Sequence, residues 1–169
     1  MPLEGFTSCA VLVPVISSGA NYKVLYTRRT ETVRDHKNQI SFPGGMREKQ
    51  DASLIETALR ETQEEIGLDP KAIEILGRLQ DLYTPTRYRI TPIVGLVSTP
   101  LKLIPNPNEI QEIFQVPLSY LLNRKNMQVQ KAEFFGRSFD LPAFKFRKHT
   151  IWGATGRITR EFVELCSGR

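Results

Sequence analysis

The segment at residues 51–66 most constrains the fold, because its helical repeat runs to a defined stop. Apolar residues recur on one face at helical spacing, and most of the other residues are good helix formers. Gly67 follows as a C-terminal stop signal, and Asp69-Pro70 prevents the helix from continuing. The sequence therefore predicts a helix over residues 51–66 that ends at Gly67.

Segments of strand composition surround this helix. Residues 9–16 and 22–27 are apolar, β-branched runs separated by a Ser-Ser-Gly-Ala-Asn turn, which predicts a hairpin. Residues 28–41 are polar and end in the motif FPGG at 42–45, which predicts a loop.

The second half of the chain continues in the same mixed order. Further strands are expected at residues 73–79, 88–97, 109–116, 128–135 and 138–146, the last two joined as a hairpin through Gly136-Arg137. Helices are expected at residues 117–122 and 154–166. Strands mixed with two main helices predict one α+β or layered α/β/α domain rather than a doubly wound βαβ array.

Length and composition place the chain among ordinary globular proteins. With 169 residues, of which 40% are apolar, residues 1–169 are expected to form a single domain with its own core. No apolar run approaches the roughly 18 to 20 residues that span a bilayer, so no membrane partner is expected. Two cysteines and no secretion signal favour a cytoplasmic protein.

Charge is distributed unevenly along the chain. The net charge of +5 makes an anionic partner plausible, but residues 21–50 carry +4 whereas residues 51–76 carry −5. An acidic island would oppose a long phosphate backbone, so nucleic acid is disfavoured as a partner. The same island suits a hard divalent cation such as Mg²⁺.

Three carboxylates of the predicted helix lie at the edge of its apolar face. At about 100° per residue from Leu54, Glu65 falls at about 20°, Glu61 at about 340° and Glu64 at about 280°. Glu61 and Glu65 also form a like-charge i,i+4 pair, which is destabilising without compensation. Two interpretations stay open on these grounds: a solvated acidic face, or a metal site that removes the cost of desolvation and repulsion. Arg60 falls at about 240°, where it could cap the helix, orient Glu64 or pair with a loop.

Two short motifs at a fixed distance extend this pattern. FPGG at residues 42–45 is followed, after fourteen residues, by RETQEEIGL at residues 60–68. Together they closely resemble the Nudix box of the Nudix hydrolase superfamily. One departure is that Asp51 stands where the box usually has Glu, with one extra residue before the Arg-Glu element, so the role of Asp51 is left open.

Further segments resemble the coenzyme A diphosphatase branch of that superfamily. These segments are LYTRRT at residues 25–30 with Arg34, NPNEIQEIFQVPL at residues 106–118, and IWGATGR at residues 151–157. Tyr26, Asn38 and Gly156 each replace the residue that is usual in the branch. The resemblance covers nearly the whole chain and implies an α+β fold of the Nudix type, an α/β/α sandwich with a mixed sheet between helices.

The resemblance also implies a chemistry. It is the hydrolysis of the pyrophosphate bond of coenzyme A or its derivatives, with Mg²⁺ or alternatively Mn²⁺ as cofactor, to 3′,5′-ADP and 4′-phosphopantetheine or its acylated form. Glu61 and Glu65 are the expected metal ligands, and Glu64 adds a ligand or helps to activate water. The remaining expected site residues bind the substrate: Arg29 and Arg34 at phosphates, and Gly44 and Gly45 by close approach of the backbone.

Several alternatives stay open. The substrate could be another nucleoside diphosphate derivative (ADP-ribose, NADH or an oxidised nucleoside triphosphate), or the chain could be a non-catalytic module that binds nucleotide or RNA. Glu109 and Glu112 could supply a further base or ligand, or face solvent. His36 and His149 are expected to be surface or packing residues. A homodimer is compatible with the sequence.

Overall fold

The computed structural model describes residues 5–31 and 38–168. Its elements, in chain order, are β1 (Thr7–Ser18), β2 (Asn21–Arg29), β3 (Ile40–Ser41), β4 (Gly44–Met46), α1 (Leu54–Ile66), β5 (Ile73–Arg78), β6 (Leu82–Tyr83), β7 (Tyr88–Ser98), β8 (Ile110–Pro117), α2 (Leu118–Leu122), β9 (Met127–Phe134), β10 (Arg137–Phe146), β11 (His149–Ile151) and α3 (Gly153–Cys166). Single 3₁₀ turns precede β5 and β9, at Pro70–Ala72 and Arg124–Asn126.

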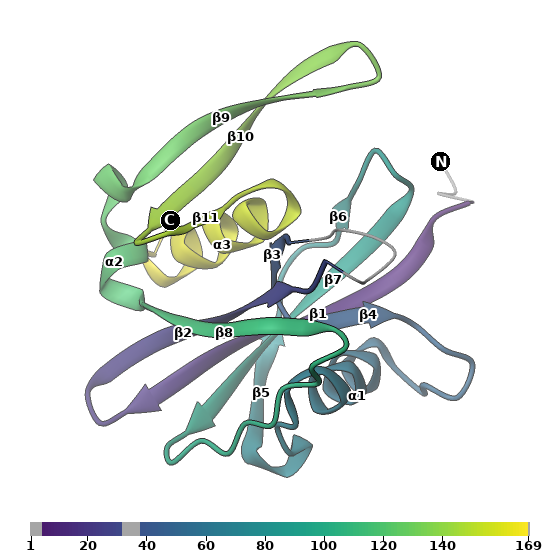
Figure 1. The fold of residues 1–169 in the computed structure, drawn as a ribbon, viewed down its shortest axis with the longest axis vertical. Helices are drawn as coiled ribbons and strands as arrows, with labels where there is room; N and C mark the ends of the chain where they lie inside the picture. Colours follow the sequence, from purple (N-terminus) through teal and green to yellow (C-terminus); the bar gives the residue numbers. More distant parts are fainter. Residues whose placement is uncertain (1–4, 32–37, 169) are drawn as a thin grey trace.

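The main sheet is mixed and lies between two helices, as predicted. β1 pairs in parallel with β7 over eleven residues, while β5 and the hairpin partner β2 are antiparallel to their neighbours. Parallel strands need a long crossover connection, and α1 and β5 lie within it. Figure 1 shows α1 on one side of the sheet and α3 on the other.

The two faces of the sheet follow the alternation of side chains along β1 and β2. Ala10, Leu12 and Leu25 pack in the core cluster that contains Ala58 and Ile66 of α1. Val13, Val15, Val24 and Tyr26 pack in the cluster that contains Ile158 and Phe162 of α3. The same alternation sends Arg29 to the α1 side of β2 and its neighbour Arg28 to the α3 side.

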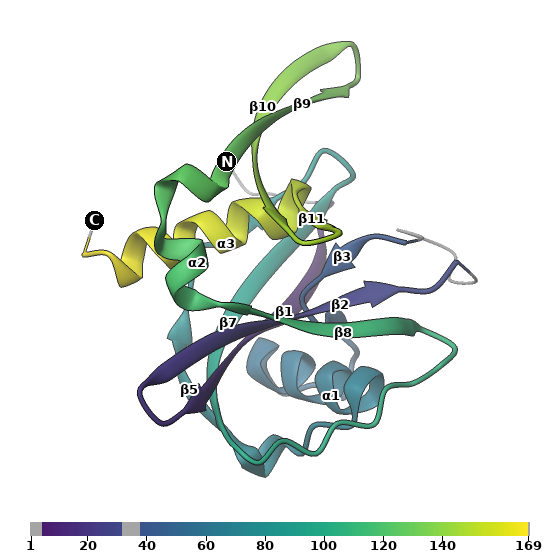
Figure 2. The same ribbon diagram turned by 60° about the vertical axis from the view of Figure 1, so that its left-hand side comes forward.

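β1 and β2 pair only near their hairpin and then separate. Their register joins Val15–Ser18 to Asn21–Val24, beyond which β4 takes the place beside β1, and β3 and β8 flank β2. Figure 2 shows β2 and β8 diverging from β1 above α1. The prediction of a loop at residues 42–45 was wrong in part, because Gly44 and Gly45 pair with β1 in a three-residue strand that depends on contacts distant in sequence.

The local signals around α1 explain its ends. The helix begins at Leu54, three residues later than predicted, because Ser53 is the N-cap and its hydroxyl accepts a hydrogen bond from the backbone N–H of Glu56. Gly67 ends the helix in the left-handed conformation with φ 68°. Its N–H donates to the carbonyl of Gln63, which confirms the predicted stop signal.

The remaining elements agree with the predicted types, with local differences. The hairpin of β9 and β10 turns through Phe135 and Gly136, one residue earlier than expected. β3, β6 and β11 are only two or three residues long, too short for their periodicity to be visible in the sequence. No helix of the described residues is long and apolar enough to cross a membrane.

A buried hydrogen bond joins the sheet to α3. The hydroxyl of Tyr26 on β2 lies 3.0 Å from Oγ1 of Thr159 on α3, and both residues are fully buried. Tyr26 also stacks between Phe42 and Phe114, with centroid distances of 4.8 and 5.6 Å. Each hydroxyl would lose its partner in a hydrophobic surrounding if the other were removed, which makes the pair energetically coupled.

We expect Tyr26→Phe and Thr159→Val each to lower the free energy of unfolding by about 1 kcal/mol, since each leaves one buried hydroxyl without a partner. The double variant should lose less than the sum of the two, because no unpaired hydroxyl is left. Urea denaturation of the four proteins gives the coupling energy. Strictly additive losses would show that the bond contributes nothing to the docking of α3.

Candidate functional site

Three carboxylates project from one edge of α1 with very different exposure. The side chain of Glu65 is 2% exposed, that of Glu61 is 17% exposed and that of Glu64 is 55% exposed. The burial of Glu65 confirms the helical projection, which placed it inside the apolar face. The three groups therefore run from the core to the surface along one edge of the helix.

Glu65 is a buried carboxyl group whose polar atoms are incompletely compensated. Its Oε1 lies 3.3 Å from Nη1 of Arg29, whereas its Oε2 is buried and has no hydrogen-bond partner among the described residues. Burial, reinforced by the neighbouring carboxylates of Glu61 and Glu109, raises the pKa of Glu65 to about 8. The Arg29 cation and the N–H of Gly44 lower the pKa but do not offset the desolvation.

Glu61 is pressed against the backbone of β4. A Cβ atom on Gly45 would lie 2.5 Å from Cδ of Glu61, closer than any real contact allows. A Cβ on Gly44 would lie 2.3 Å from the carbonyl oxygen of Ala10 in β1. At Gly44 the obstructing atoms are backbone of β1, so only glycine lets β4 pair there, whereas a side chain at Gly45 would displace the carboxylate of Glu61. Burial raises the pKa of Glu61 despite its contact with Arg60.

Arg60 connects the exposed part of the acidic cluster to the preceding loop. Its Nε and Nη2 donate to the two carboxylate oxygens of Asp51, each at 3.0 Å, and Nη1 contacts Glu61 at 2.9 Å and Glu64 at 3.2 Å. Nη2 also donates to the carbonyl of Met46. Of the roles left open for Arg60, the structure shows pairing with a loop and contact with Glu64. The contact with Glu61 was not predicted.

Asp51 holds the loop against the start of α1. Besides Arg60, its Oδ2 accepts hydrogen bonds from the hydroxyl of Thr57 and the N–H of Glu48, both at 2.9 Å. These donors, Arg60 first, hold the pKa of Asp51 well below its usual range. The role left open for Asp51 is therefore structural: it fixes Arg60 and joins residues 46–51 to the helix.

Glu109 and Glu112 lie in different surroundings. Residues 101–109 wrap the end of α1, with the N–H groups of Ile104 and Asn106 donating to the carbonyls of Ile66 and Glu65. The amide of Asn106 donates to Glu109, whose charge raises the pKa of both Glu61 and Glu65. No pattern in the sequence distinguishes Glu109, which lies near Glu61 and Glu65, from Glu112, which does not.

Glu112 belongs to a separate charged group on the α3 side of β8. Its Oε1 lies 3.1 Å from Nζ of Lys148 and 3.4 Å from Nε2 of His149. His149 is buried and stacks on Phe114 at 3.8 Å, which confirms it as a packing residue. Burial lowers the pKa of His149.

The predicted phosphate-binding residues are only partly described. Arg29 faces Glu65, so its charge is shared with a buried carboxylate. Its Nε is buried without a hydrogen-bond partner in the described part of the chain. Arg34 and His36 lie outside the described residues.

The carboxylates of α1 supply the oxygen ligands that a divalent cation such as Mg²⁺ prefers. No three carboxylate, imidazole or thiolate groups of residues 5–31 and 38–168 enclose a metal position, and Nη1 of Arg60 contacts both Glu61 and Glu64. The buried, unpartnered Oε2 of Glu65 nevertheless lacks a cation or donor. Mg²⁺ commonly takes one or two carboxylates and completes its shell with water and phosphate oxygens, so this incomplete set suits it.

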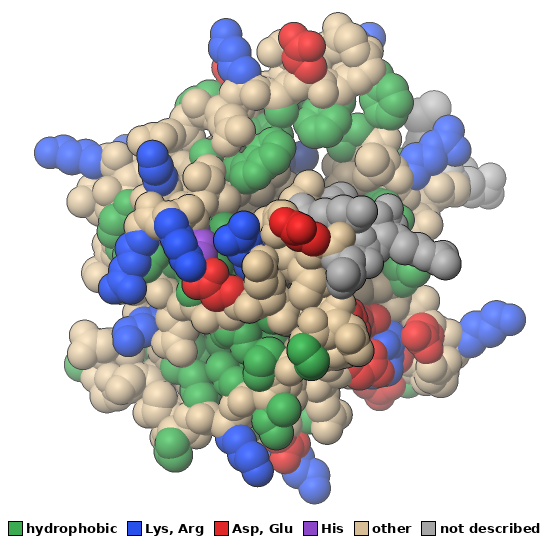
Figure 3. Space-filling view, in the orientation of Figure 1, with side chains coloured by type: hydrophobic (Ala, Val, Ile, Leu, Met, Phe, Trp, Pro, Cys, Tyr) green, Lys and Arg blue, Asp and Glu red, His purple; other side chains and the backbone are tan. Residues whose placement is uncertain are grey.

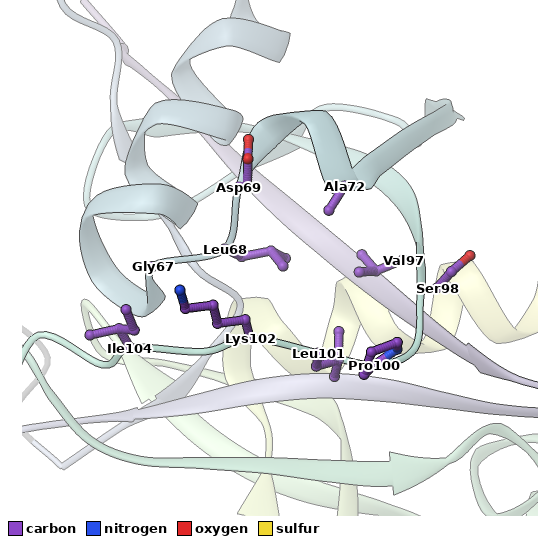
Figure 4. A pocket seen from close by; sticks show the side chains of 10 residues that line it. All are labelled: Gly67, Leu68, Asp69, Ala72, Val97, Ser98, Pro100, Leu101, Lys102 and Ile104. Carbon is purple, nitrogen blue, oxygen red and sulfur yellow. The ribbon is translucent and has the colours of Figure 1, made fainter.

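Two hollows of the described surface lie away from these carboxylates. One, of about 280 Å³, is lined by residues at the end of α1 and by the segment from Pro100 to Ile104 (Figure 4). The other, of about 490 Å³, lies between α3 and the connection from β5 to β6. None of the predicted site residues lines either hollow.

Comparison with known proteins gives one family. The profile described as NUDIX domain matches residues 8–137. A curated relative from Photorhabdus laumondii, called uncharacterized Nudix hydrolase NudL, is 37% identical over 155 residues, which cover 92% of this chain and 82% of that protein.

Two solved structures share the fold at low sequence identity. The MutT protein from Methanosarcina mazei Go1 has a TM-score of 0.60 at 19% identity, covering 97% of this chain and 96% of that one. The NUDIX domain of Shewanella oneidensis NrtR, solved with ADP ribose, has a TM-score of 0.52 at 19% identity, covering 70% of this chain and 77% of that one.

The depressed pKa of Asp51 gives a prediction about acid stability. Below about pH 4 the unfolded chain takes up a proton on Asp51 before the native state does, so the free energy of unfolding falls as pH falls. Asp51→Asn should be less stable near pH 6, because Arg60 loses its charged partner. Its free energy of unfolding should also decline less steeply in acid. Urea denaturation between about pH 3 and pH 6 tests both points; parallel curves would contradict the role given to Asp51.

Proposed function

The chain belongs to the NUDIX family and is a Nudix hydrolase acting on nucleoside diphosphate derivatives, and from this premise we propose that its substrate is coenzyme A or an acylated derivative. The products would be 3′,5′-ADP and 4′-phosphopantetheine or its acylated form. The branch-specific segments at residues 25–30, 106–118 and 151–157 support this choice. We further propose that residues 1–169 act as one domain in the cytoplasm on a small molecule.

The observation that carries the proposal is the buried carboxylate of Glu65 with its unpartnered oxygen beside Glu61. Nudix hydrolases generally use divalent metals. We assign Glu61 and Glu65 as the residues that would hold Mg²⁺, with Mn²⁺ as the alternative. When bound, the ion would neutralise charge on the transferring phosphoryl group and lower the pKa of bound water.

The other carboxylate is assigned a different task. Glu64 is the most exposed of the three, and among the described residues only its Oε2 has a hydrogen-bond partner, Nη1 of Arg60. Its other oxygen is therefore available to orient or deprotonate water, or to add a ligand. Arg60 fixes the positions of Glu61 and Glu64 relative to each other, and Asp51 fixes Arg60.

Gly44, Gly45, Arg29 and Arg34 complete the proposed substrate site. The absence of side chains on the two glycines lets backbone approach Glu61, and thus the phosphates next to the ion. Arg29 stands beside Glu65 with its side chain 22% exposed, and we assign it to a substrate phosphate together with Arg34. Coenzyme A carries a 3′-phosphate in addition to its pyrophosphate, which gives more than one cation an anion to bind.

ADP-ribose is the second candidate substrate. The S. oneidensis domain that shares this fold was solved with ADP ribose. NADH and oxidised nucleoside triphosphates carry the same type of pyrophosphate group. The same carboxylates could act on them, so they stay alternative substrates.

We expect Glu65→Gln to lower kcat by about a hundredfold or more, because the amide cannot replace a ligand carboxylate. The native fold should persist, since the amide is isosteric and uncharged where burial disfavours charge. Mg²⁺ should raise the Tm of the wild-type protein and not that of the variant. The matched control is Glu74→Gln on exposed β5, which should retain both activity and the Mg²⁺ response. Full activity of Glu65→Gln would overturn the ligand assignment.

A substrate panel decides the branch. Coenzyme A, ADP-ribose, NADH and nucleoside triphosphates are compared at equal concentration with Mg²⁺, and products are separated by chromatography. We expect the highest kcat/KM for coenzyme A, with 3′,5′-ADP as one product. Cleavage of another compound in preference to coenzyme A would reject the assignment to the coenzyme A diphosphatase branch. The proposal of a metal-dependent hydrolase would still hold.

A further inference from the structure

The hairpin of β9 and β10 projects from the body of the protein and ends in an exposed aromatic residue. Figure 1 shows the hairpin extending beyond α3, and hydrophobic side chains lie at the surface over it in Figure 3. Phe135 at the tip is 86% exposed, and Val129 on β9 is 65% exposed. A two-stranded ribbon that leaves such side chains in water gains little stability from burial.

The backbone of Phe135, at the tip of the hairpin, has a conformation that is unfavourable for a bulky residue. Phe135 and Gly136 have φ values of 49° and 72°, as the two central positions of a type I′ turn require. Asn, Asp or Gly is favoured at the first of these positions, whereas a bulky residue with positive φ is an outlier. A Phe that is both exposed and strained stabilises neither the turn nor the core, which indicates that its side chain serves a contact outside the protomer.

β9 is an unprotected sheet edge. The small sheet has the order β11-β10-β9, so one side of β9 has no strand beside it among the described residues. The eight-residue strand MQVQKAEF has no proline, and its register with β10 runs without a bulge. Short length, proline, bulges and repelling charges are the usual means of protecting an edge, and of these β9 has only the charges of one lysine and one glutamate.

When two copies of β9 are paired antiparallel, one register places opposite charges across from each other. Lys131 and Glu133 point to the same face, two residues apart. A two-fold axis at Ala132 sets Lys131 opposite Glu133 of the second copy, and the reverse. An axis at residue 131 or 133 would instead set like charges opposite each other, and an axis at residue 130 would leave both charges opposite apolar residues.

The same register buries the exposed apolar side chains. With the axis at Ala132, Val129 lies close to the turn of the second copy, which carries Phe135, and this approach occurs twice. Neither Lys131 nor Glu133 has an ion-pair partner within its own chain among the described residues. One register therefore satisfies the charges, the apolar side chains and the free backbone groups together.

We propose that β9 is a dimerisation edge, at which two copies of this chain join antiparallel about Ala132 into one continuous six-stranded sheet. The paired area is small, so dissociation constants in about the micromolar range are expected. The inference concerns a surface remote from the carboxylates of α1 and does not depend on the identity of the substrate.

Charge reversal tests the register. Lys131→Glu and Glu133→Lys each place like charges opposite each other twice, and each should weaken the dimer at least about tenfold. An equimolar mixture of the two variants should form a heterodimer, because each chain then faces opposite charges. Sedimentation velocity of each variant and of the mixture measures this, and circular dichroism verifies the fold. Lys125→Glu, outside the edge, is the matched control and should dimerise like the wild-type protein.

The mixture separates assembly from misfolding. Lys131→Glu also faces Asp140 within its own hairpin, so weakening in that variant alone could reflect an altered hairpin. Recovery of a dimer on mixing can come only from contact between the two chains. Phe135→Asn should weaken the dimer while stabilising the turn. The proposal would be overturned if the wild-type protein were monomeric at all micromolar concentrations. It would also be overturned by a dimer whose dissociation constant neither charge reversal changes.

Discussion

The close approach of β4 to α1 is the constraint on which the candidate site depends. Gly44 lets a short strand pair closely beside β1, and Gly45 brings the backbone of that strand against the carboxylate of Glu61. The separation of β1 from β2 makes room for that strand. Glu65, one helical turn after Glu61, is thereby enclosed and faces Arg29 from β2. Parts of the chain distant in sequence are thus fixed around one edge of one helix.

Positive charge near this edge is divided between two tasks. Arg60 is bound to Asp51 through two donors and uses its remaining donors on the more exposed carboxylates Glu61 and Glu64. Arg29 alone faces the innermost carboxylate, through one contact of 3.3 Å. A single long ion pair does not compensate the desolvation of Glu65, whose pKa is accordingly high. The acidic edge is therefore well supported at its surface and under-compensated at its core, where a divalent cation has the most to contribute.

Features that depend on local sequence were predicted correctly, whereas features that depend on contacts distant in sequence were missed. The stop at Gly67 and the burial of Glu65 follow from helix geometry alone, and both are seen. The projection placed Arg60 away from Glu61 because it treats the helix in isolation and ignores the reach of a flexible side chain. Residues 42–45 were assigned to a loop for a similar reason, since a three-residue strand exists only through its pairing with β1. The difference between Glu109 and Glu112 arises from the wrapping of residues 101–109 around α1, which no repeat in the sequence encodes.

Stability and chemistry are located in different parts of the molecule. The two apolar clusters and the buried pair of Tyr26 and Thr159 hold the layers together with satisfied contacts. The edge of α1 instead retains an unpartnered buried oxygen, which costs free energy in the absence of a ligand. A fold that gains enough from its clusters tolerates this cost. The net charge of +5 is consistent with the same division, because basic residues spread over the chain outnumber the carboxylates gathered at one acidic edge, which is the proposed site for a metal and a pyrophosphate.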